Sequence, residues 1–316
     1  MSDKIATRAA YGKTLVALGQ EDERIVVLDA DLSGSTTTAL FAREFPERFF
    51  NIGIAEANMM GVAAGLAASG KIPFASTFAI FAAGRAYEQV RQSIAYPAFP
   101  VKIAATHAGI SVGADGASHQ AIEDVTLMRV IPGMTVICPC DAVETAGAIK
   151  AAVAHDGPVY LRLGRHPVPV VMPENHQFTL GKAYSLRRGE DVALMASGLM
   201  VSVCLEAAAM LSQEGIEAEV INISTIKPLD EAAVVEAARR CKAVVTAEEH
   251  SIFGGLGSAV AEVLGEKCPT PLQMVGVRDR FGQSGAVPRL LEEYGLTPGA
   301  VVQAVRQVIS SKNSSN

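Results

Sequence analysis

The sequence predicts an α/β protein with two doubly wound domains whose sheets are mostly parallel. Short apolar runs of strand length alternate along the chain with longer segments of helical periodicity, the pattern of successive βα units. A proline-rich stretch at 167–177 interrupts the alternation. Polar clusters follow several expected strands, at the edge where open α/β sheets bind ligands. We place the domains at 1–171 and 187–316, joined by a linker at 172–186.

The first domain begins with an amphipathic helix at 7–19, for which Gly19 is the stop signal. A buried strand is expected at 25–28. Residues 49–54 predict another buried strand, and the helix that follows at 55–69 is too apolar to face water on any side. The other expected elements are, in order, a strand ending near 77, a helix ending near 95, a strand at 101–105, a helix at 121–130, a strand at 135–138, a helix at 142–154 and a strand at 158–163.

The second domain repeats this pattern. Its expected strands lie at 192–196, 217–223, 243–247 and 272–275, and its expected helices at 199–213, 230–240, from 258 to 264 and at 297–309. The glycine-rich turn at 254–257, GGLG, lacks the GxGxxG spacing of a nucleotide-binding loop and predicts only a helix start. The final residues, 310–316, are expected to form a polar tail.

Composition excludes several classes of protein. The chain has 316 residues, of which 49% are hydrophobic and 19% charged, which is ordinary for a globular protein with two cores. Its net charge of −6 argues against nucleic acid or an anionic membrane as a general partner. The sequence contains neither a signal-peptide pattern nor a run of about 18 apolar residues, so we expect a cytoplasmic protein. Five cysteines without a CxxC pair predict neither a disulfide framework nor a zinc site.

Glu56 is the only ionisable group in the stretch 51–70, NIGIAEANMMGVAAGLAASG. It stands where the expected strand gives way to the helix. Apolar neighbours favour the protonated carboxyl, whereas a helix N-terminus favours the anion. A carboxyl held between these two effects can share a proton with a ligand. The alternative is that Glu56 only caps the helix by accepting hydrogen bonds from first-turn amides.

Two further clusters follow expected strands. Residues 29–38, which include Asp31 and Ser35, gather Asp, Ser, Thr and Gly at the end of one strand, where they suit either a ligand or ordinary helix capping. Phe78 and Phe81, with Arg85 four residues later, could stack on a flat ring, although a single Phe is more often part of a core.

The loop at 106–120 carries the most chemistry in the chain. It combines His107, Asp115 and His119 with three glycines between a strand and a helix. A histidine near a strand end is suited to proton transfer at physiological pH. The alternative is a structural loop in which glycines make turns and polar side chains tie down the backbone. Arg165 follows the expected strand at 158–163, and an arginine at a strand end can bind a phosphate in a forked geometry.

Taken together, four segments resemble the C-terminal half of a transketolase. They are NIGIAEANMMGVAAGLA, STFAIFAAGRAYEQVRQSIAY, THAGISVGADGASHQAIED and TIKPLD. Residues 4–171 are similar to the pyrimidine-binding domain, and the rest to the transketolase C-terminal domain. The resemblance implies a transferase that acts in carbohydrate metabolism, for example in the pentose phosphate pathway. Such an enzyme moves a two-carbon glycolaldehyde unit from a ketose phosphate to an aldose.

The resemblance also implies thiamine diphosphate (thiamine pyrophosphate) as cofactor. Glu56 would hydrogen-bond the ring nitrogen of the aminopyrimidine, through which the family activates the cofactor. Phe78 and Phe81 would stack on or flank that ring, and Asp31 would lie close to the cofactor. The position of a third aromatic residue of the family falls near Gly84, so Arg85 or Tyr87 is expected to substitute for it.

Substrate roles follow from the same similarity. His107 and Asp115 would contact sugar hydroxyls, while His119 and Arg165 would bind the substrate phosphate. Glu56, His107 and His119 would be the catalytic residues. Ser35 and Arg8 match further phosphate contacts of the family more loosely. These assignments are expectations that the resemblance implies.

The family binds the diphosphate through a divalent ion held by a GDG sequence and, roughly thirty residues later, an Asn. The nearest match here is 113–116, GADG, and no Asn occurs between Asn58 and Asn175. We therefore expect no metal ligand in this chain. A separate N-terminal subunit would supply the diphosphate site and the Mg²⁺ or other divalent ion, giving a two-plus-two heterotetramer with the active site at the interface.

Two alternatives have similar architecture. One is the β subunit of a 2-oxoacid dehydrogenase decarboxylase component, and the other is a non-catalytic binding or regulatory module of the same fold. Deoxyxylulose-phosphate synthase also shares much of this half, but as part of one long chain. The intact loop at 106–120 and the LGRHP sequence favour a phosphorylated sugar, and the retained Glu56 and loop histidines disfavour the non-catalytic module.

Overall fold

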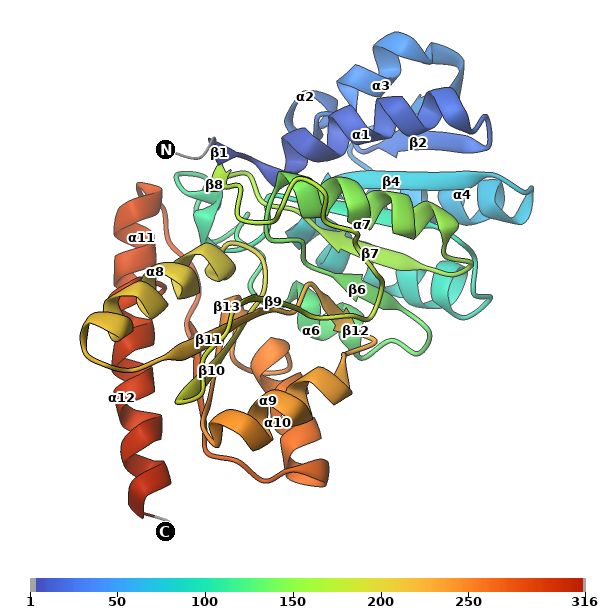
Figure 1. The fold of residues 1–316 in the computed structure, drawn as a ribbon. Coiled ribbons are helices and arrows are strands. Elements are labelled where there is room, and N and C mark those ends of the chain that lie inside the picture. Colours follow the sequence, from blue (N-terminus) through green and yellow to red (C-terminus); the bar gives the residue numbers. More distant parts are fainter. Residues whose placement is uncertain (1–3, 315–316) are drawn as a thin grey trace.

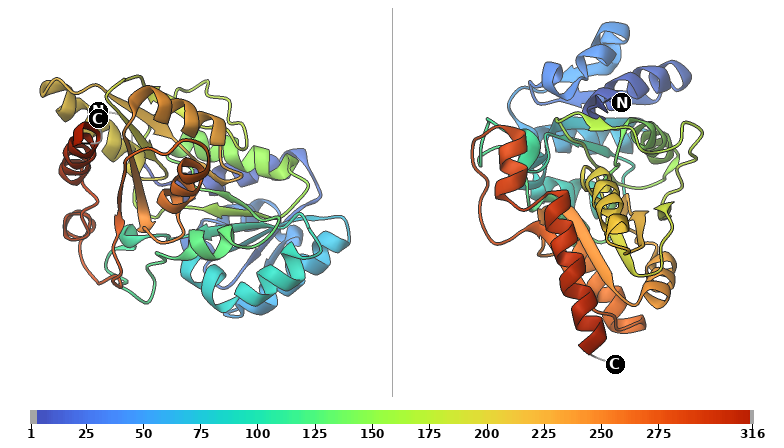
Figure 2. Two further views of the ribbon diagram at one scale, coloured as in Figure 1. Left: turned by 90° about the horizontal axis from the view of Figure 1, so that it is seen from below. Right: turned by 60° about the vertical axis from the view of Figure 1, so that its left-hand side comes forward.

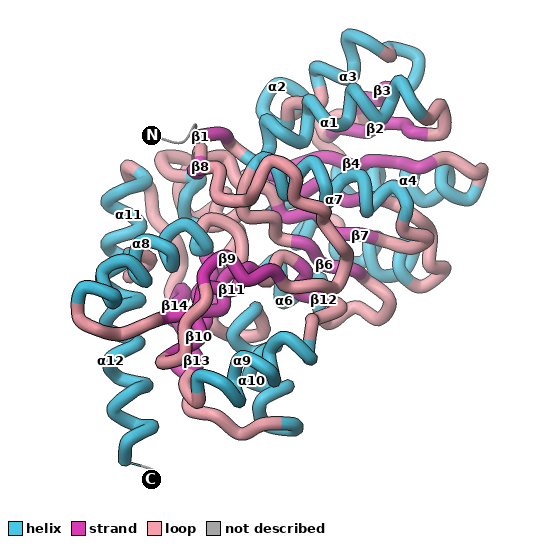
Figure 3. Tube along the Cα trace, in the orientation of Figure 1, coloured by secondary structure: helices cyan, strands magenta, loops and turns pink. Residues whose placement is uncertain are grey.

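A computed structural model describes residues 4–314 of the chain, which form two parallel-stranded sheets with helices on both faces, as the sequence predicts (Figure 1). One sheet has seven strands and the other has five. Figure 3 shows their strands as two separate groups. Each group is surrounded by helices, so the layers are those of two doubly wound domains.

The first sheet has the strand order β12-β6-β7-β5-β4-β2-β3, and all its strands are parallel except β12. Its parallel strands are β2 (Ile25–Asp29), β3 (Phe49–Asn51), β4 (Ile72–Phe78), β5 (Lys102–Thr106), β6 (Thr135–Ile137) and β7 (Val159–Arg162). One face packs on α1 (Thr7–Glu21), α3 (Ala39–Glu44) and α7 (Ala142–Ala154). The other face packs on α4 (Glu56–Ala68), the helical segment from 81 to 95, which contains α5 (Tyr87–Gln89), and α6 (Asp124–Arg129).

The second sheet has the order β14-β13-β10-β11-β9, with β9 antiparallel to the rest. Its strands are β9 (Tyr184–Arg187), β10 (Val192–Ala196), β11 (Ala218–Asn222), β13 (Val244–Ser251) and β14 (Leu272–Val277). Helices α8 (Met200–Gln213) and α12 (Pro298–Ser314) share one core cluster with it, and α9 (Glu231–Cys241) and α10 (Leu256–Lys267) share another. Figure 2 shows α12 running along the outer side of this sheet.

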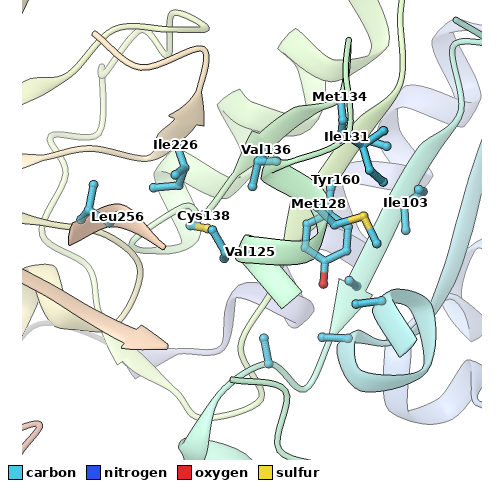
Figure 4. Close-up of a cluster of buried hydrophobic side chains, with 14 of the residues drawn as sticks. Ile103, Val125, Met128, Ile131, Met134, Val136, Cys138, Tyr160, Ile226 and Leu256 are labelled. Atoms are coloured by element: carbon cyan, nitrogen blue, oxygen red, sulfur yellow. The ribbon is translucent and has the colours of Figure 1, made fainter. Parts of the chain in front are cut away.

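The two domains share backbone pairing and core. Strand β12 (Thr225–Lys227) belongs to the second half of the chain but pairs with β6 at the edge of the first sheet. The core on the α4 side of the first sheet continues into the α9 and α10 side of the second. Figure 4 shows Ile226 and Leu256 of the second half close to Cys138 and Val125 of the first. A two-stranded ribbon of β1 (Lys4–Ile5) and β8 (Val168–Pro169) adds a further connection within the first half.

A buried group of polar side chains, which we call the junction cluster, crosses the same boundary. It consists of Asp124, Tyr160 and Arg162 of the first domain with Glu249 and His250 of the second. The carboxylate of Asp124 accepts hydrogen bonds from Arg162 Nε at 2.9 Å and from the Tyr160 hydroxyl at 2.8 Å. Arg162 also donates to the backbone carbonyl of Glu249 at 3.0 Å. The cluster therefore ties the second domain to the carboxyl end of β7.

Several expected features differ from the structure. Helix α1 continues past Gly19 to Glu21, because Gly19 packs closely against Phe41 and Phe45 rather than ending the helix. Residues 49–54 form only a three-residue strand, and Ile54 is 77% exposed, so a buried strand was wrong there.

Helix α4 also departs from the expectation, since one of its faces is exposed. Its outward positions carry small or apolar residues, among them Ala57, Gly61, Val62 and Gly65. Strands β9 and β12 and helix α11 (Val287–Glu293) had no counterpart in the sequence prediction. The expected polar tail is helical as far as Ser314, and residues 315 and 316 lie outside the described part of the chain, as do residues 1–3.

Candidate functional site

The candidate residues gather where the parallel strands of the first sheet end. In register, Asp29 of β2 lies beside Ser76 of β4, and Phe78 of β4 beside Thr106 of β5. The carboxyl ends of neighbouring parallel strands meet at one edge of the sheet, so loops far apart in sequence become neighbours there. We selected the candidate residues because they follow expected strands. The observed strand pairing brings the loops that carry them to the same edge of the sheet.

Glu56 is the first residue of α4 and its side chain is only 5% exposed. Its Oε1 accepts a hydrogen bond from Arg85 Nη1 at 3.0 Å. Among the hydrogen bonds of residues 4–314, no first-turn amide of α4 donates to the Glu56 carboxylate, so helix capping does not account for it. A buried carboxylate whose described partner is a half-exposed arginine is a group that a ligand can reach.

An aromatic stack extends from this carboxylate across the strand ends. The guanidinium carbon of Arg85 lies 4.1 Å from the centre of the Phe81 ring. Phe81 and Phe78 are nearly parallel, with centroids 5.8 Å apart, and His107 stacks on Phe78 at 3.8 Å. His119 meets the edge of both Phe rings, at 5.4 and 6.1 Å. The two phenylalanines therefore form one aromatic wall at the strand ends, in which Phe78 is buried and Phe81 is partly exposed.

His107 is held in one neutral tautomer by its neighbours. Its backbone φ is +56°, a conformation in which few side chains other than Asn, Asp and His are found. Nδ1 lies 3.0 Å from the Thr106 hydroxyl, and Nε2 lies 3.4 Å from Arg8 Nη1. An arginine only donates, so Nε2 accepts and the proton is on Nδ1. Burial lowers the pKa of His107 to about 3, with the positive charges of Arg8, Arg165 and His119 acting in the same direction.

Arg8 connects this histidine to the loop after β2. Its Nη1 donates to the backbone carbonyl of Ser35 at 2.6 Å. The loop itself is ordered by Asp29, which accepts from the Leu32 amide and from the hydroxyls of Thr36 and Thr38. Burial raises the pKa of the Asp29 carboxyl, although these hydrogen bonds act against it.

Asp31 lies at the exposed end of the same loop. Its backbone φ is +64°, and its Oδ1 accepts from Asn51 Nδ2 at 3.0 Å. Asn51 ends β3, shortly before Glu56 in the chain. The pair therefore holds the ends of two neighbouring strands together beside α4.

Arg165 and Asp115 form an open ion pair at the other end of the wall. Arg165 Nη1 donates to Asp115 Oδ2 at 3.2 Å and to the backbone carbonyl of Val112 at 3.0 Å. The two side chains are 40% and 35% exposed. His119, half-buried nearby, has Nδ1 2.9 Å from the Ser118 hydroxyl. These groups offer positive charge to an anionic ligand that approaches the strand ends.

Most candidate residues thus belong to one chain of contacts. It runs through the following residues: Glu56, Arg85, Phe81, Phe78, His119, His107, Arg8 and Ser35. Asp31 lies outside this chain of contacts, as does the Arg165–Asp115 ion pair, and Tyr87 packs against the core instead. Sequence reasoning missed Thr106 and Asn51 as partners of site residues, although their place at strand ends was a usable signal.

The described residues lack two features, a metal-binding cluster and a membrane-spanning helix. Within residues 4–314, no group of three or more His, Cys, Asp or Glu side chains is arranged to hold a metal ion. No helix in the same part of the chain is long and apolar enough to cross a membrane.

Comparison with known proteins places the chain among thiamine-dependent enzymes of one family. Residues 3–170 match the family described as transketolase, pyrimidine binding domain, and residues 181–301 match transketolase, C-terminal domain. The chain is 49% identical over 306 residues to a 6-deoxy-6-sulfo-D-fructose transketolase subunit of Clostridium sp. (strain MSTE9), covering 97% of this chain and 95% of the relative.

Two other proteins are similar over nearly their whole lengths. One is a putative transketolase C-terminal section of Methanocaldococcus jannaschii, 49% identical over 304 residues and covering 95% of each chain. The other is a solved structure described as a split gene transketolase, inactive beta4 tetramer. It superposes with a TM-score of 0.92 at 58% identity, covering 98% of this chain and 99% of that one.

Proposed function

The chain belongs to the transketolase family, whose enzymes are thiamine-diphosphate-dependent transferases, and we propose that it is the catalytic C-terminal subunit of a split transketolase. In the proposed reaction a ketose phosphate gives up a two-carbon glycolaldehyde unit to an aldose phosphate. The products are a shortened aldose phosphate and a lengthened ketose phosphate. The observation that carries the proposal is the buried Glu56 carboxylate next to the Phe81 ring, linked to it by Arg85.

The residues fit one part of the cofactor. A buried carboxylate beside the partly exposed Phe81 ring suits a flat ring with a hydrogen-bonding edge, such as an aminopyrimidine. Residues 4–314 offer no comparable set of ligands for a divalent ion that would hold a diphosphate. The buried carboxylate and the aromatic wall therefore support a site in which this chain binds the pyrimidine ring.

When bound, thiamine diphosphate supplies a nucleophilic carbon that breaks the ketose C2–C3 bond and carries the two-carbon unit. The role proposed for Glu56 is to hold and exchange a proton with the ring nitrogen of the aminopyrimidine. Phe78 and Phe81 orient the ring, and Asp31 lies close to the cofactor. Arg85 contacts Glu56 and Phe81, two of these four residues.

The polar residues around the wall are assigned to the sugars. His107 is neutral at physiological pH, so its ring can exchange hydrogen bonds with a sugar hydroxyl without a charge to desolvate. Asp115 is proposed as a second hydroxyl contact. His119 and Arg165, with Arg8 and Ser35 behind them, are assigned to the terminal phosphate, since three of the four can bring positive charge to it.

The positive side chains at the site suit either a phosphate or a sulfo group on the sugar. The Clostridium relative is named for 6-deoxy-6-sulfo-D-fructose, a sugar that carries a sulfo group. Arginine and histidine recognise either anion by charge and hydrogen bonds. Both classes of donor sugar therefore belong in the test of function.

An N-terminal partner subunit is proposed to complete the site. The relatives' names, a subunit and a C-terminal section, support a two-chain enzyme, and the related solved structure is described as an inactive tetramer of one chain type. In this chain Ile54, two residues before Glu56, is 77% exposed, and Val62 on the outward face of α4 is 36% exposed. Apolar side chains exposed beside a site support a covering partner. We assign the diphosphate and the divalent ion to that partner in a two-plus-two heterotetramer.

The test is a coupled assay with xylulose 5-phosphate and ribose 5-phosphate in the presence of thiamine diphosphate and Mg²⁺. The chain is assayed alone and with its candidate N-terminal partner, and a parallel series uses 6-deoxy-6-sulfofructose as donor. Activity only in the mixture supports the proposal. If the chain alone is as active as the mixture, no partner is needed. If the mixture is inactive with both donors, the proposed reaction is contradicted.

A further inference from the structure

Arg85 makes both of the contacts that the proposed function assigns to the aminopyrimidine ring. It donates to Glu56 Oε1 at 3.0 Å, and it lies 4.1 Å over the centre of the Phe81 ring. A guanidinium is flat and delocalised and carries its N–H donors in its plane, so it can stack and donate at the same time. An aminopyrimidine ring has the same two properties.

From this coincidence we propose that Arg85 is a placeholder, occupying the position of the aminopyrimidine ring until the cofactor displaces it. The inference rests on the proposed function and adds to it an exclusion: Arg85 and the cofactor ring cannot both contact Glu56 and Phe81. Cofactor binding then requires the Arg85 side chain to leave.

The spacing of the aromatic wall supports mutual exclusion. Stacked groups approach to about 3.5–4.0 Å, so a ring inserted between two others needs them roughly 7–8 Å apart. Phe78 and Phe81 are 5.8 Å apart, and Phe78 and His107 only 3.8 Å. A ring therefore cannot enter either gap. A ring that stacks on Phe81 and also reaches Glu56 has to take the volume that Arg85 fills.

The chain around Arg85 allows this movement. The Arg85 side chain is 55% exposed, whereas that of Glu56 is 5% exposed, so the arginine approaches from the solvent side. Arg85 is the last residue of a single π-helical turn, Phe81–Arg85. A Cβ placed on the preceding Gly84 would meet no atom within 4 Å, so open space adjoins the turn. The side chain can leave without disturbing the core.

In the absence of cofactor, Arg85 stabilises the buried carboxylate of Glu56. A buried carboxylate that loses its partner is unfavourable, because its charge is neither solvated nor paired. Arg85 pairs with Glu56 until another donor arrives. The cost is competition, since each cofactor molecule has to break this ion pair and the contact with Phe81 before it binds.

Competition predicts an unusual direction of change. In Arg85→Met, the dissociation constant of thiamine diphosphate in the complex with the N-terminal subunit, measured by isothermal titration calorimetry with Mg²⁺ present, is expected to fall about threefold to tenfold. This range corresponds to the loss of one half-exposed ion pair and one cation–π contact. Arg85→Lys keeps the charge but not the flat group and should bind with intermediate affinity. Arg91→Met is the matched control, because Arg91 is exposed on the same segment and donates to Gln92. Its affinity should equal that of the wild type.

A second measurement needs no substitution. In the wild-type complex with the N-terminal subunit and Mg²⁺, with this chain labelled with ¹⁵N-arginine, the Nε–Hε proton of Arg85 should carry an upfield shift from the Phe81 ring before cofactor is added. Addition of thiamine diphosphate should abolish that shift, with Arg85→Met used to assign the signal. A structural role for Arg85 would leave the shift in place.

The outcomes separate the two proposals. Weaker or unchanged cofactor binding by Arg85→Met, or binding with the Arg85 signal still shifted by Phe81, overturns the placeholder while leaving the cofactor assignment intact. A wild-type complex that takes up no thiamine diphosphate overturns the proposed function and the placeholder with it. Tighter binding by Arg85→Met together with release of the Arg85 signal supports both.

Discussion

Two groups of charged side chains lie at the strand ends of the first sheet. They contain similar residues but differ in role, since one joins the two domains and the other is available to a ligand. In the junction cluster, Asp124 is fully buried and bonded to both Arg162 and Tyr160. At the aromatic wall, Glu56 is also buried, but its described partner is the half-exposed Arg85. The two carboxylates differ in their hydrogen-bond partners. Asp124 is bonded to two side chains that are fully or almost fully buried, whereas Glu56 is bonded to one half-exposed arginine. Fully bonded charges hold domains together, and incompletely bonded ones are available to a ligand.

Substitution of Glu56 is expected to have the largest effect, and on activity alone. Glu56→Gln removes a group that can exchange a proton, so turnover of the reconstituted enzyme should fall by about 10²–10⁴. Steady-state assays with the N-terminal subunit measure this, and urea unfolding of the variant provides the control. Full turnover in this variant would show that the wall carboxylate is not part of the chemistry.

The junction cluster should show the opposite pattern. Asp124→Asn leaves the Arg162 guanidinium buried without its counter-charge, and breaking such a pair costs about 3–5 kcal/mol in the free energy of unfolding. The matched comparison is Asp115→Asn, which breaks the open pair with Arg165 and should cost at most about 1 kcal/mol. Urea denaturation of both variants checks the prediction. Equal losses of stability would remove the distinction between the two regions.

Arg165 is expected to affect substrate binding but not stability. Loss of a charge-assisted hydrogen bond to the terminal anion costs about 1.5–3 kcal/mol, so Arg165→Met should raise KM for a phosphorylated donor roughly tenfold to a hundredfold. Arg24→Met is the control, because it breaks an exposed pair with Asp22 at the opposite end of β2. The assignment of Arg165 to the substrate anion would be withdrawn if KM were the same in both variants.

A further expected effect is a pH dependence of stability from His107. Its pKa is about 3 in the folded protein and 6.5 in the reference state, so between these values only the unfolded chain binds the proton. Its contribution is therefore fully present above pH 6.5 and is lost as the pH falls toward 3. Comparing wild type with His107→Asn cancels the other titrating groups, among them Glu248, whose pKa burial raises to about 7.

The difference in unfolding free energy between the two proteins should fall by about 1.4 kcal/mol per pH unit below pH 6. Urea unfolding at several pH values between 6.5 and 4.5 measures it. A difference independent of pH would mean that His107 binds a proton as readily in the folded protein as in the unfolded chain.

The same contrast explains what the sequence could and could not predict. The wall residues were found because parallel strands put polar loops at one edge, and Glu56 was conspicuous in an apolar stretch. The contact of Arg85 with Glu56 joins residues 29 positions apart in the sequence, and Arg85 is the last residue of a π-helical turn. Periodicity carries no signal for such a turn.

Burial at the surface of α4 was mispredicted for a related reason. Periodicity reports which residues are apolar, and Val62 and Ile54 are apolar but exposed in this chain. A surface that binds another protein can carry exposed apolar residues, which the sequence alone does not distinguish from core residues. Strand β12 escaped prediction because it is three residues long, irregular in register, and paired with a strand about 90 residues earlier.

The most direct measurement of the central claim is exchange of the cofactor's thiazolium C2 proton for deuterium, followed by NMR after acid quench in the complex with the N-terminal subunit. It reports how the protein activates the cofactor, whatever the sugar substrate is. The account predicts fast exchange in the wild type, exchange slowed by about 10²–10⁴ in Glu56→Gln, and wild-type exchange in Asp115→Asn. Equal exchange rates in wild type and Glu56→Gln would contradict it.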